Sequence, residues 1–254
     1  MVREVREGAP HIGPFGSRRV AQDAVDALHD ALPLRQCTLR LATVSRALGS
    51  PCALAGMGRC SAPCTAVDTP DAAYAAVARA AADALTGDPS PVVAALASRI
   101  ARLAAEERFE EAGLVTGRLR AFVQGAGRAQ RLAPLAACAE LVAARPDALG
   151  GWELVVVRHA RLAATAVSRP GEDPLAVVAA LRATAETVDP PVPPAPACHP
   201  EEAGLVVNWL ESPGVRLVHA STPWALPVRS ALSHADLADV SGEVRQRITT
   251  MAPC

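Results

Sequence analysis

The sequence Met-Gly-Arg-Cys-Ser-Ala-Pro-Cys at residues 57–64 closes a group of four closely spaced cysteines. Fourteen, seven and three residues separate the members of this group in turn, which are Cys37, Cys52, Cys60 and Cys64. Thiolates that converge from one short segment are the ligands that iron–sulfur clusters and structural zinc ions prefer. The glycines and prolines between them favour an irregular loop. We therefore predict a loop that folds around a metal centre rather than around an apolar core of its own.

Three states of these thiols are open: an iron–sulfur cluster, a zinc ion, or cysteines without metal. Structural zinc sites favour paired C-x2-C knuckles, and none occurs in this chain, so the spacing favours the iron–sulfur cluster. The total of seven cysteines is odd, which argues against the disulfide framework of a secreted protein. In a reducing compartment, clustered cysteines are more typical of a metal site.

The basic residues indicate a local patch. The formal net charge of −1 excludes a globally basic nucleic-acid-binding protein. All 25 basic residues are arginines, and residues 31–67 carry four of them without any Asp or Glu: Arg35, Arg40, Arg46 and Arg59. Two roles are open for these four arginines. They either contact DNA phosphates or compensate the negative charge of a cluster held by four thiolates.

No stretch approaches the ~20 apolar residues of a membrane span, and the N-terminal residues lack the apolar core of a signal peptide. We therefore expect a cytoplasmic protein that does not associate with membranes.

The N-terminal half is predicted to be mostly helical. A strand is expected over residues 2–12, followed by a helix that Ser17 caps and Pro33 ends. Thr69-Pro70 and Ser90-Pro91 are start signals for two further helices. The second of these and the helix after it form an antiparallel hairpin at about residues 92–125, whose apolar faces include Leu103, Phe109 and Phe122. Such narrow apolar faces require a docking partner.

The C-terminal half contains the strands. Residues 152–167 have the pattern of a β-hairpin with a turn at His159-Ala160, and a helix is expected over residues 174–187. A further helix and strand are expected within residues 201–219. The predicted fold is therefore α+β and mostly helical, with four parts: a cysteine cluster module (1–68), a helical region with the hairpin (69–130), a small β-containing α/β region with a proline-rich linker at 189–200 (131–228), and a tail without a core (229–254).

Three blocks of this sequence, in order, resemble the middle of the UvrC family, the C subunit of the bacterial excinuclease, and its relatives that carry an exonuclease. Residues 12–17 with 31–37 resemble the junction after the family's GIY-YIG nuclease domain. The four cysteines resemble the family's cysteine-rich region. Residues 104–112, Ala-Ala-Glu-Glu-Arg-Phe-Glu-Glu-Ala, resemble the core of its UVR motif, although Thr116-Gly117 replaces the usual charged pair.

The resemblance implies a 4Fe–4S cluster on the four cysteines, with zinc as the alternative. It also implies a role in nucleotide excision repair, with DNA and the excinuclease B subunit as partners, the latter bound by a surface that includes Leu103, Phe109 and Phe122. The active-site motifs of the family's nuclease domains do not occur in the chain, so we expect a non-catalytic UvrC-like module or fragment. The competing interpretation is a regulatory adaptor that resembles McsA, which also combines a metal site with a UVR hairpin.

Overall fold

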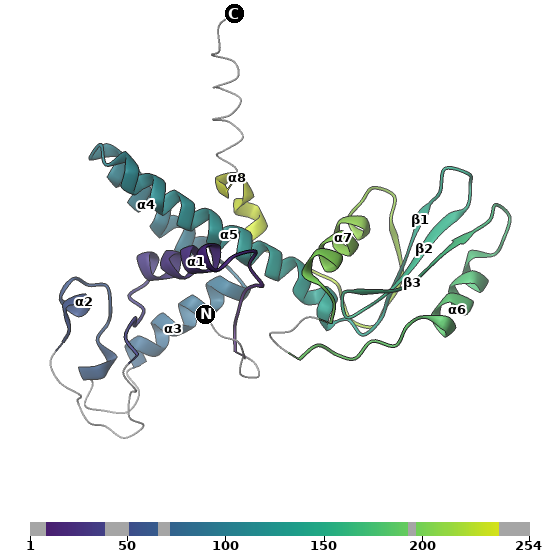
Figure 1. Cartoon of the computed structure of the whole chain (residues 1–254), viewed down its shortest axis with the longest axis horizontal. Coiled ribbons are helices and arrows are strands. Elements are labelled where there is room, and N and C mark those ends of the chain that lie inside the picture. Colours follow the sequence, from purple (N-terminus) through teal and green to yellow (C-terminus); the bar gives the residue numbers. More distant parts are fainter. Residues whose placement is uncertain (1–8, 39–50, 66–71, 193–196, 239–254) are drawn as a thin grey trace, which may run out of the picture. The chain divides into compact units, whose positions relative to one another are not determined.

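The structure is a computed structural model, and it describes residues 9–38, 51–65, 72–192 and 197–238 (Figure 1). Within these residues the chain is α+β and mostly helical, with one four-stranded sheet, which confirms the predicted fold class. It forms two compact units. Of the described residues, unit 1 contains 10–38, 51–65, 72–128 and 227–238, and unit 2 contains 9, 129–192 and 197–226. No helix of the described residues combines the length and the apolar character that crossing a membrane requires.

The regular elements of unit 1, where it is described, are all helices. The predicted cap of its first helix is confirmed, since the side chain of Ser17 accepts a hydrogen bond from the backbone amide of Val20 at 3.2 Å. The predicted strand at residues 2–12 lies mostly outside the described residues, and residues 9–12 form no strand. The helices are α1 (Arg18–Ala31), α2 (Ala53–Gly56), η1 (Pro63–Thr65), α3 (Ala72–Thr86), α4 (Ser90–Ala105), α5 (Phe109–Ala137), η2 (Ala231–His234) and α8 (Ala235–Ala238).

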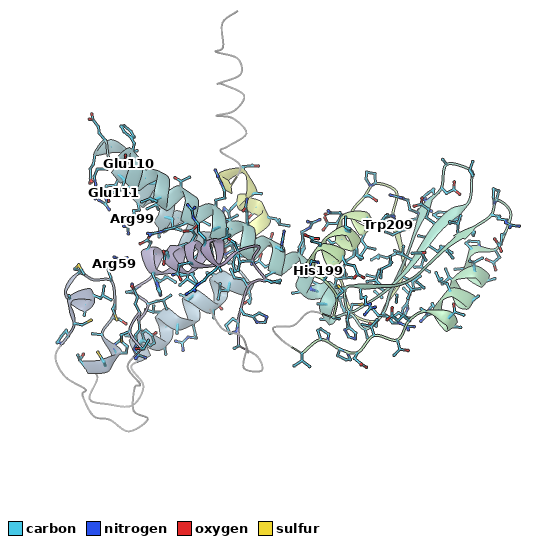
Figure 2. All side chains as sticks on the ribbon, in the orientation of Figure 1. Arg59, Arg99, Glu110, Glu111, His199 and Trp209 are labelled. Carbon is cyan, nitrogen blue, oxygen red and sulfur yellow. The ribbon has the colours of Figure 1, made fainter. Side chains whose placement is uncertain are left out.

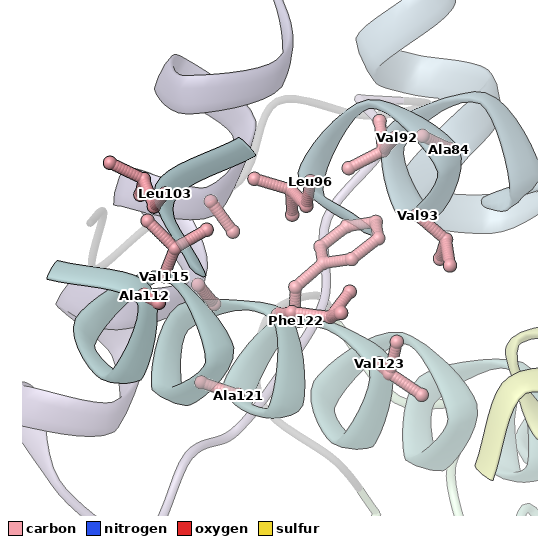
Figure 3. Close-up of a cluster of buried hydrophobic side chains, with 13 residues drawn as sticks. Ala84, Val92, Val93, Leu96, Leu103, Ala112, Val115, Ala121, Phe122 and Val123 are labelled. Atoms are coloured by element: carbon pink, nitrogen blue, oxygen red, sulfur yellow. The ribbon is translucent and has the colours of Figure 1, made fainter. Parts of the chain in front are cut away.

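The core of unit 1 lies between α1, α4 and α5. Phe122 of α5 is completely buried and is surrounded by side chains of α4 such as Leu96 (Figure 3). α1 adds Ala24 and Ala27 to the same core and packs against α4. The two hairpin helices therefore bury their apolar faces against each other and against α1.

Residues 229–254 were predicted to be a tail, and the structure describes this segment as far as residue 238. Ala231 is completely buried. Arg229 pairs with Asp88 at 3.3 Å, and His234 Nε2 lies 3.1 Å from the hydroxyl of Ser90. Contacts between residues more than 130 positions apart thus attach this segment to the start of α4. A local sequence pattern cannot predict such contacts.

Unit 2 is built on an antiparallel sheet with the strand order β3-β2-β1-β4. The predicted β-hairpin is confirmed as β2 (Trp152–Arg158) and β3 (Arg161–Ser168), with His159 and Ala160 in its turn at φ values of 51° and 67°. β4 (Arg216–Ala220) was also expected, whereas β1 (Leu141–Pro146) was missed. Two helices accompany the sheet, α6 (Pro174–Thr184) and α7 (Pro200–Leu210).

Alternation along β1 produces two cores, one on each face of the sheet. Leu141 and Ala143 share a core with residues of α7, while Val142 and Ala144 share the other core with residues of α6. Both faces of the sheet are therefore covered, and all three tryptophans of the chain lie within this unit.

Candidate functional site

The cysteine segment, residues 51–65, is an irregular loop with two short helical turns. The backbone carbonyl of Cys52 accepts the amide of Gly56 at 3.1 Å and so begins α2, and Cys64 lies in η1. Between them the chain turns at Gly58 and Ala62, with φ values of 69° and 53°. A positive φ is uncommon for a residue other than glycine. Next to Ala62, the backbone amide of Ser61 donates to the carbonyl of Pro33 at 3.2 Å.

The four predicted ligands differ in exposure. Cys60 is buried at 9% exposure, Cys64 is half-buried, and Cys37 and Cys52 are exposed. Four thiols suit a soft metal by their chemistry. In the described part of the chain, however, no three Cys, His, Asp or Glu side chains are grouped as they would be around a metal ion. The metal centre therefore stays a prediction.

The arginines of the predicted basic patch are engaged within the protein wherever they are described. Arg35 donates from Nε to the sulfur of Cys37 at 3.0 Å. Arg59 pairs with Asp30 at 3.3 Å. Arg40 and Arg46 lie outside the described residues. Of the two roles left open, local charge compensation thus has direct geometric support for Arg35, whose guanidinium lies beside a predicted ligand.

Asp30 is the centre of an ion cluster that joins the cysteine segment to the hairpin. Its side chain is only 1% exposed. Besides Arg59, it pairs with Arg99 of α4 at 3.2 Å and with Arg118 of α5 at 2.6 Å. Arg59 and Arg99 are labelled beside α1 in Figure 2. A carboxylate in the last turn of a helix interacts unfavourably with the negative end of the helix dipole. The three arginines, rather than the helix itself, therefore stabilise Asp30 at this position.

The structure separates the three residues predicted to bind a partner. Leu103 and Phe122 are 2% and 0% exposed and belong to the core of unit 1. Phe109 is 66% exposed, and Leu114, five residues further along α5, is 64% exposed. Sequence periodicity identified one apolar stripe but could not show which of its residues are buried in the core that α4, α5 and α1 share. Among the large apolar side chains of α4 and α5 that the structure describes, only Phe109 and Leu114 are exposed.

The tip between α4 and α5 is acidic and has an unusual backbone. Residues 102–111 carry four glutamates and two arginines, a formal charge of −2, and Figure 2 shows Glu110 and Glu111 at this tip. Hydrogen bonds from Arg108 lower the pKa of Glu106 and of Glu111, which keeps both carboxylates ionised. Glu107 has a φ of 59°, a conformation that glycine usually supplies at the end of a helix.

We define the tip surface as Phe109 and Leu114 with Gly113, Gly117 and the flanking glutamates Glu106, Glu107, Glu110 and Glu111. A methyl group added at Gly113 or at Gly117 would meet no atom of the described residues within 4 Å, apart from the nearby backbone of α5. Glycine lowers helix propensity by about 1 kcal/mol relative to alanine, so both positions weaken α5 locally. Their exposure next to Leu114 gives them a second property, since they let another chain approach the backbone of α5 closely.

Unit 2 offers few arginines for contact with an anionic ligand. It carries seven arginines and ten carboxylates, a formal charge of −3. Five of the seven arginines form ion pairs within the unit, namely Arg131, Arg145, Arg158, Arg161 and Arg182. A sixth, Arg216, stacks over the ring of Trp152 at 5.4 Å. Six of the seven arginines of unit 2 are therefore engaged within the unit.

Comparison with known proteins gives matches at two levels. A family described as the UvrC/Cho excinuclease, middle domain, matches residues 1–84. A Mycobacterium tuberculosis protein named as a bifunctional exonuclease/endonuclease is 36% identical over 225 residues, which are 87% of this chain and 34% of that protein. The chain thus spans about a third of the length of this relative. No solved structure matches the chain.

Two proteins named UvrABC system protein C also match. The one from Geobacter metallireducens is 33% identical over 123 residues, 48% of this chain and 19% of the relative. The one from Desulforudis audaxviator is 27% identical over 213 residues, 81% of this chain and 34% of the relative. The similarity therefore extends beyond the cysteine segment and the hairpin into unit 2.

Proposed function

Because this chain is a UvrC-like family member, we propose that it acts in nucleotide excision DNA repair as a module that holds an iron–sulfur cluster and contacts both DNA and the excinuclease B subunit. The observation that carries this proposal is the link between two features. The segment with four cysteines and the helical hairpin belong to one unit, and Asp30 bonds to both. A ligand on the first and a partner on the second would then share one scaffold.

The cluster is proposed to be a 4Fe–4S cluster held by Cys37, Cys52, Cys60 and Cys64. When bound, it supplies an anionic centre that fixes the path of the loop. Nε of Arg35 lies 3.0 Å from the sulfur of Cys37 and so places a positive charge beside this proposed ligand. Burial of Cys60 limits the access of water to one ligand.

Docking to the excinuclease B subunit is proposed to use the tip surface. Exposed apolar side chains rimmed by ionised glutamates suit a partner that offers an apolar pocket surrounded by basic residues. This surface replaces the broader one expected from the sequence, because Leu103 and Phe122 face the core of unit 1.

Replacing Phe109 by Ala is expected to weaken the complex with the B subunit by about tenfold or more, because a 66% exposed ring is buried only on binding. Titration calorimetry of the full chain with the isolated B subunit measures this. The matched control is Leu149→Ala, which removes an 82% exposed apolar side chain from unit 2 and should leave the affinity unchanged. Equal affinity for wild type and Phe109→Ala would remove the tip surface from the proposal.

DNA binding is expected to be weak, independent of sequence and steeply dependent on salt. Replacing Arg40 and Arg46 by Ala should flatten the slope of log affinity against log salt by about two units, one for each lost phosphate contact. Arg59→Ala should change the slope less, because its guanidinium already pairs with Asp30. Fluorescence anisotropy with a labelled bubble duplex gives the slope, with Arg131→Ala in unit 2 as the control. A slope that stays the same in the double variant contradicts the assignment.

A further inference from the structure

Asp30 is the point where three segments far apart in sequence meet. Arg59, from the cysteine segment, and Arg99, from α4, both bond to Oδ1, at 3.3 Å and 3.2 Å. Arg118, from α5, bonds to Oδ2 at 2.6 Å and lies 3.5 Å from Asp26. Two arginines from different parts of the unit therefore share one oxygen of a side chain that is 1% exposed.

The charges in this cluster do not balance. Three arginines surround two carboxylates, so one arginine can leave while each carboxylate keeps a cationic partner. Arg59 is the one that leaves most easily, because it lies on a loop, its ion pair is longer than the other two on Asp30, and its side chain is the most exposed, at 43%. Loss of a second arginine would leave the buried carboxylate short of partners, which is strongly destabilising.

From this geometry we infer that Asp30 couples the cysteine segment to the α4–α5 hairpin through competition between Arg59 and Arg99 for one carboxylate oxygen. Drawing Arg59 away leaves Oδ1 to Arg99 and strengthens the attachment of α4 to α1. Because coupling is reciprocal, a change that breaks the Arg99–Asp30 ion pair strengthens the Arg59–Asp30 ion pair and so fixes the neighbouring Cys60 more firmly. Asp30 is thus a positioning residue for two surfaces that it does not itself form.

The coupling is a property of unit 1 alone. Its use, in which an anionic ligand such as a DNA phosphate captures Arg59 and thereby tightens the hairpin, rests on the proposed function. A test without DNA, metal or partner therefore separates the two: it can fail while the repair role stands, and it can succeed in a protein with another role.

The test is a double-mutant cycle read by hydrogen exchange of the full-length chain. Exchange of the amides in α1 is measured for wild type, Arg59→Ala, Arg99→Ala and the double variant. After either single change, Asp30 keeps two arginine partners, whereas after the double change it keeps only Arg118. We expect the double variant to accelerate exchange by at least about threefold more than the product of the two single effects.

Two controls assign the coupling to Asp30. Arg102 also lies on α4 but pairs with Glu106 at 3.1 Å, so the Arg59→Ala and Arg102→Ala effects should multiply without excess. In an Asp30→Asn background, the excess in the Arg59 and Arg99 cycle should vanish. If Asp30→Asn does not fold, comparing the Arg59/Arg99 cycle with the Arg59/Arg102 cycle still tests the inference. Purely multiplicative effects of Arg59→Ala and Arg99→Ala, or an equal excess with Arg102→Ala, would overturn the inference.

Discussion

Phe122→Ala is expected to destabilise unit 1 by about 3–5 kcal/mol, because it removes a completely buried aromatic ring and leaves a cavity between α4 and α5. A loss of this size is a large share of the total stability of a small domain. Hydrogen exchange should therefore accelerate through α1, α4 and the first part of α5. The readout is specific, because Phe122 is not part of either core of unit 2.

The matched control is Leu114→Ala on the same helix. Its side chain is 64% exposed, so its removal should leave exchange in the core of unit 1 nearly unchanged. All three tryptophans lie in unit 2, so their fluorescence reports on the unfolding of that unit. The urea concentration at its unfolding midpoint should be the same in both variants. If Phe122→Ala behaved like Leu114→Ala, the assignment of Phe122 to the core rather than to a docking surface would be wrong.

Gly151→Ala is expected to destabilise unit 2 by about 3 kcal/mol or more. A methyl group on Gly151 would lie 2.0 Å from the backbone carbonyl oxygen of Ser168, the partner of Trp152 in the β2–β3 ladder. The clash is with backbone and not with a flexible side chain, so the two strands must separate at this end of the sheet. The midpoint of urea unfolding, followed by tryptophan fluorescence, should fall markedly.

Gly204→Ala is the control with the opposite sign. Gly204 lies within α7, and a methyl group there meets no atom within 4 Å beyond the backbone of its own helix. Alanine favours the helix by about 1 kcal/mol over glycine, so the same midpoint should rise or stay unchanged. If Gly151→Ala were as well tolerated as Gly204→Ala, the close approach of residue 151 to β3 would be incorrect.

Local signals explain which elements could be predicted from the sequence. The cap at Ser17, the hairpin of β2 and β3, and the helices α6 and α7 all have start, stop or alternation signals within a few residues. α5 extends to Ala137, well beyond the predicted end near residue 125, although several glycines lower its helix propensity. Tertiary packing compensates at Gly125, where an added methyl group would lie 2.6 Å from the ring of Phe15.

Features that depend on residues far apart in the chain could not be predicted from the sequence. The apolar stripe with Leu103 and Phe122 is visible from spacing, but spacing does not show that α1 and the hairpin itself cover it. The role of Asp30 could not be predicted, because a single acidic residue at the end of a helix forms no local pattern and its three arginines lie 29, 69 and 88 residues away. Ala231 was missed for the same reason.

The most direct test of the central claim is the metal content of the full-length chain purified without oxygen. A 4Fe–4S cluster on the cysteine segment predicts about four iron atoms and four sulfides per chain and a brown protein. Cys60→Ser should lose the iron, whereas Cys138→Ser, which changes a buried cysteine of unit 2, should keep it. Stoichiometric zinc without iron in the fresh protein, or full retention of iron in Cys60→Ser, would contradict the account.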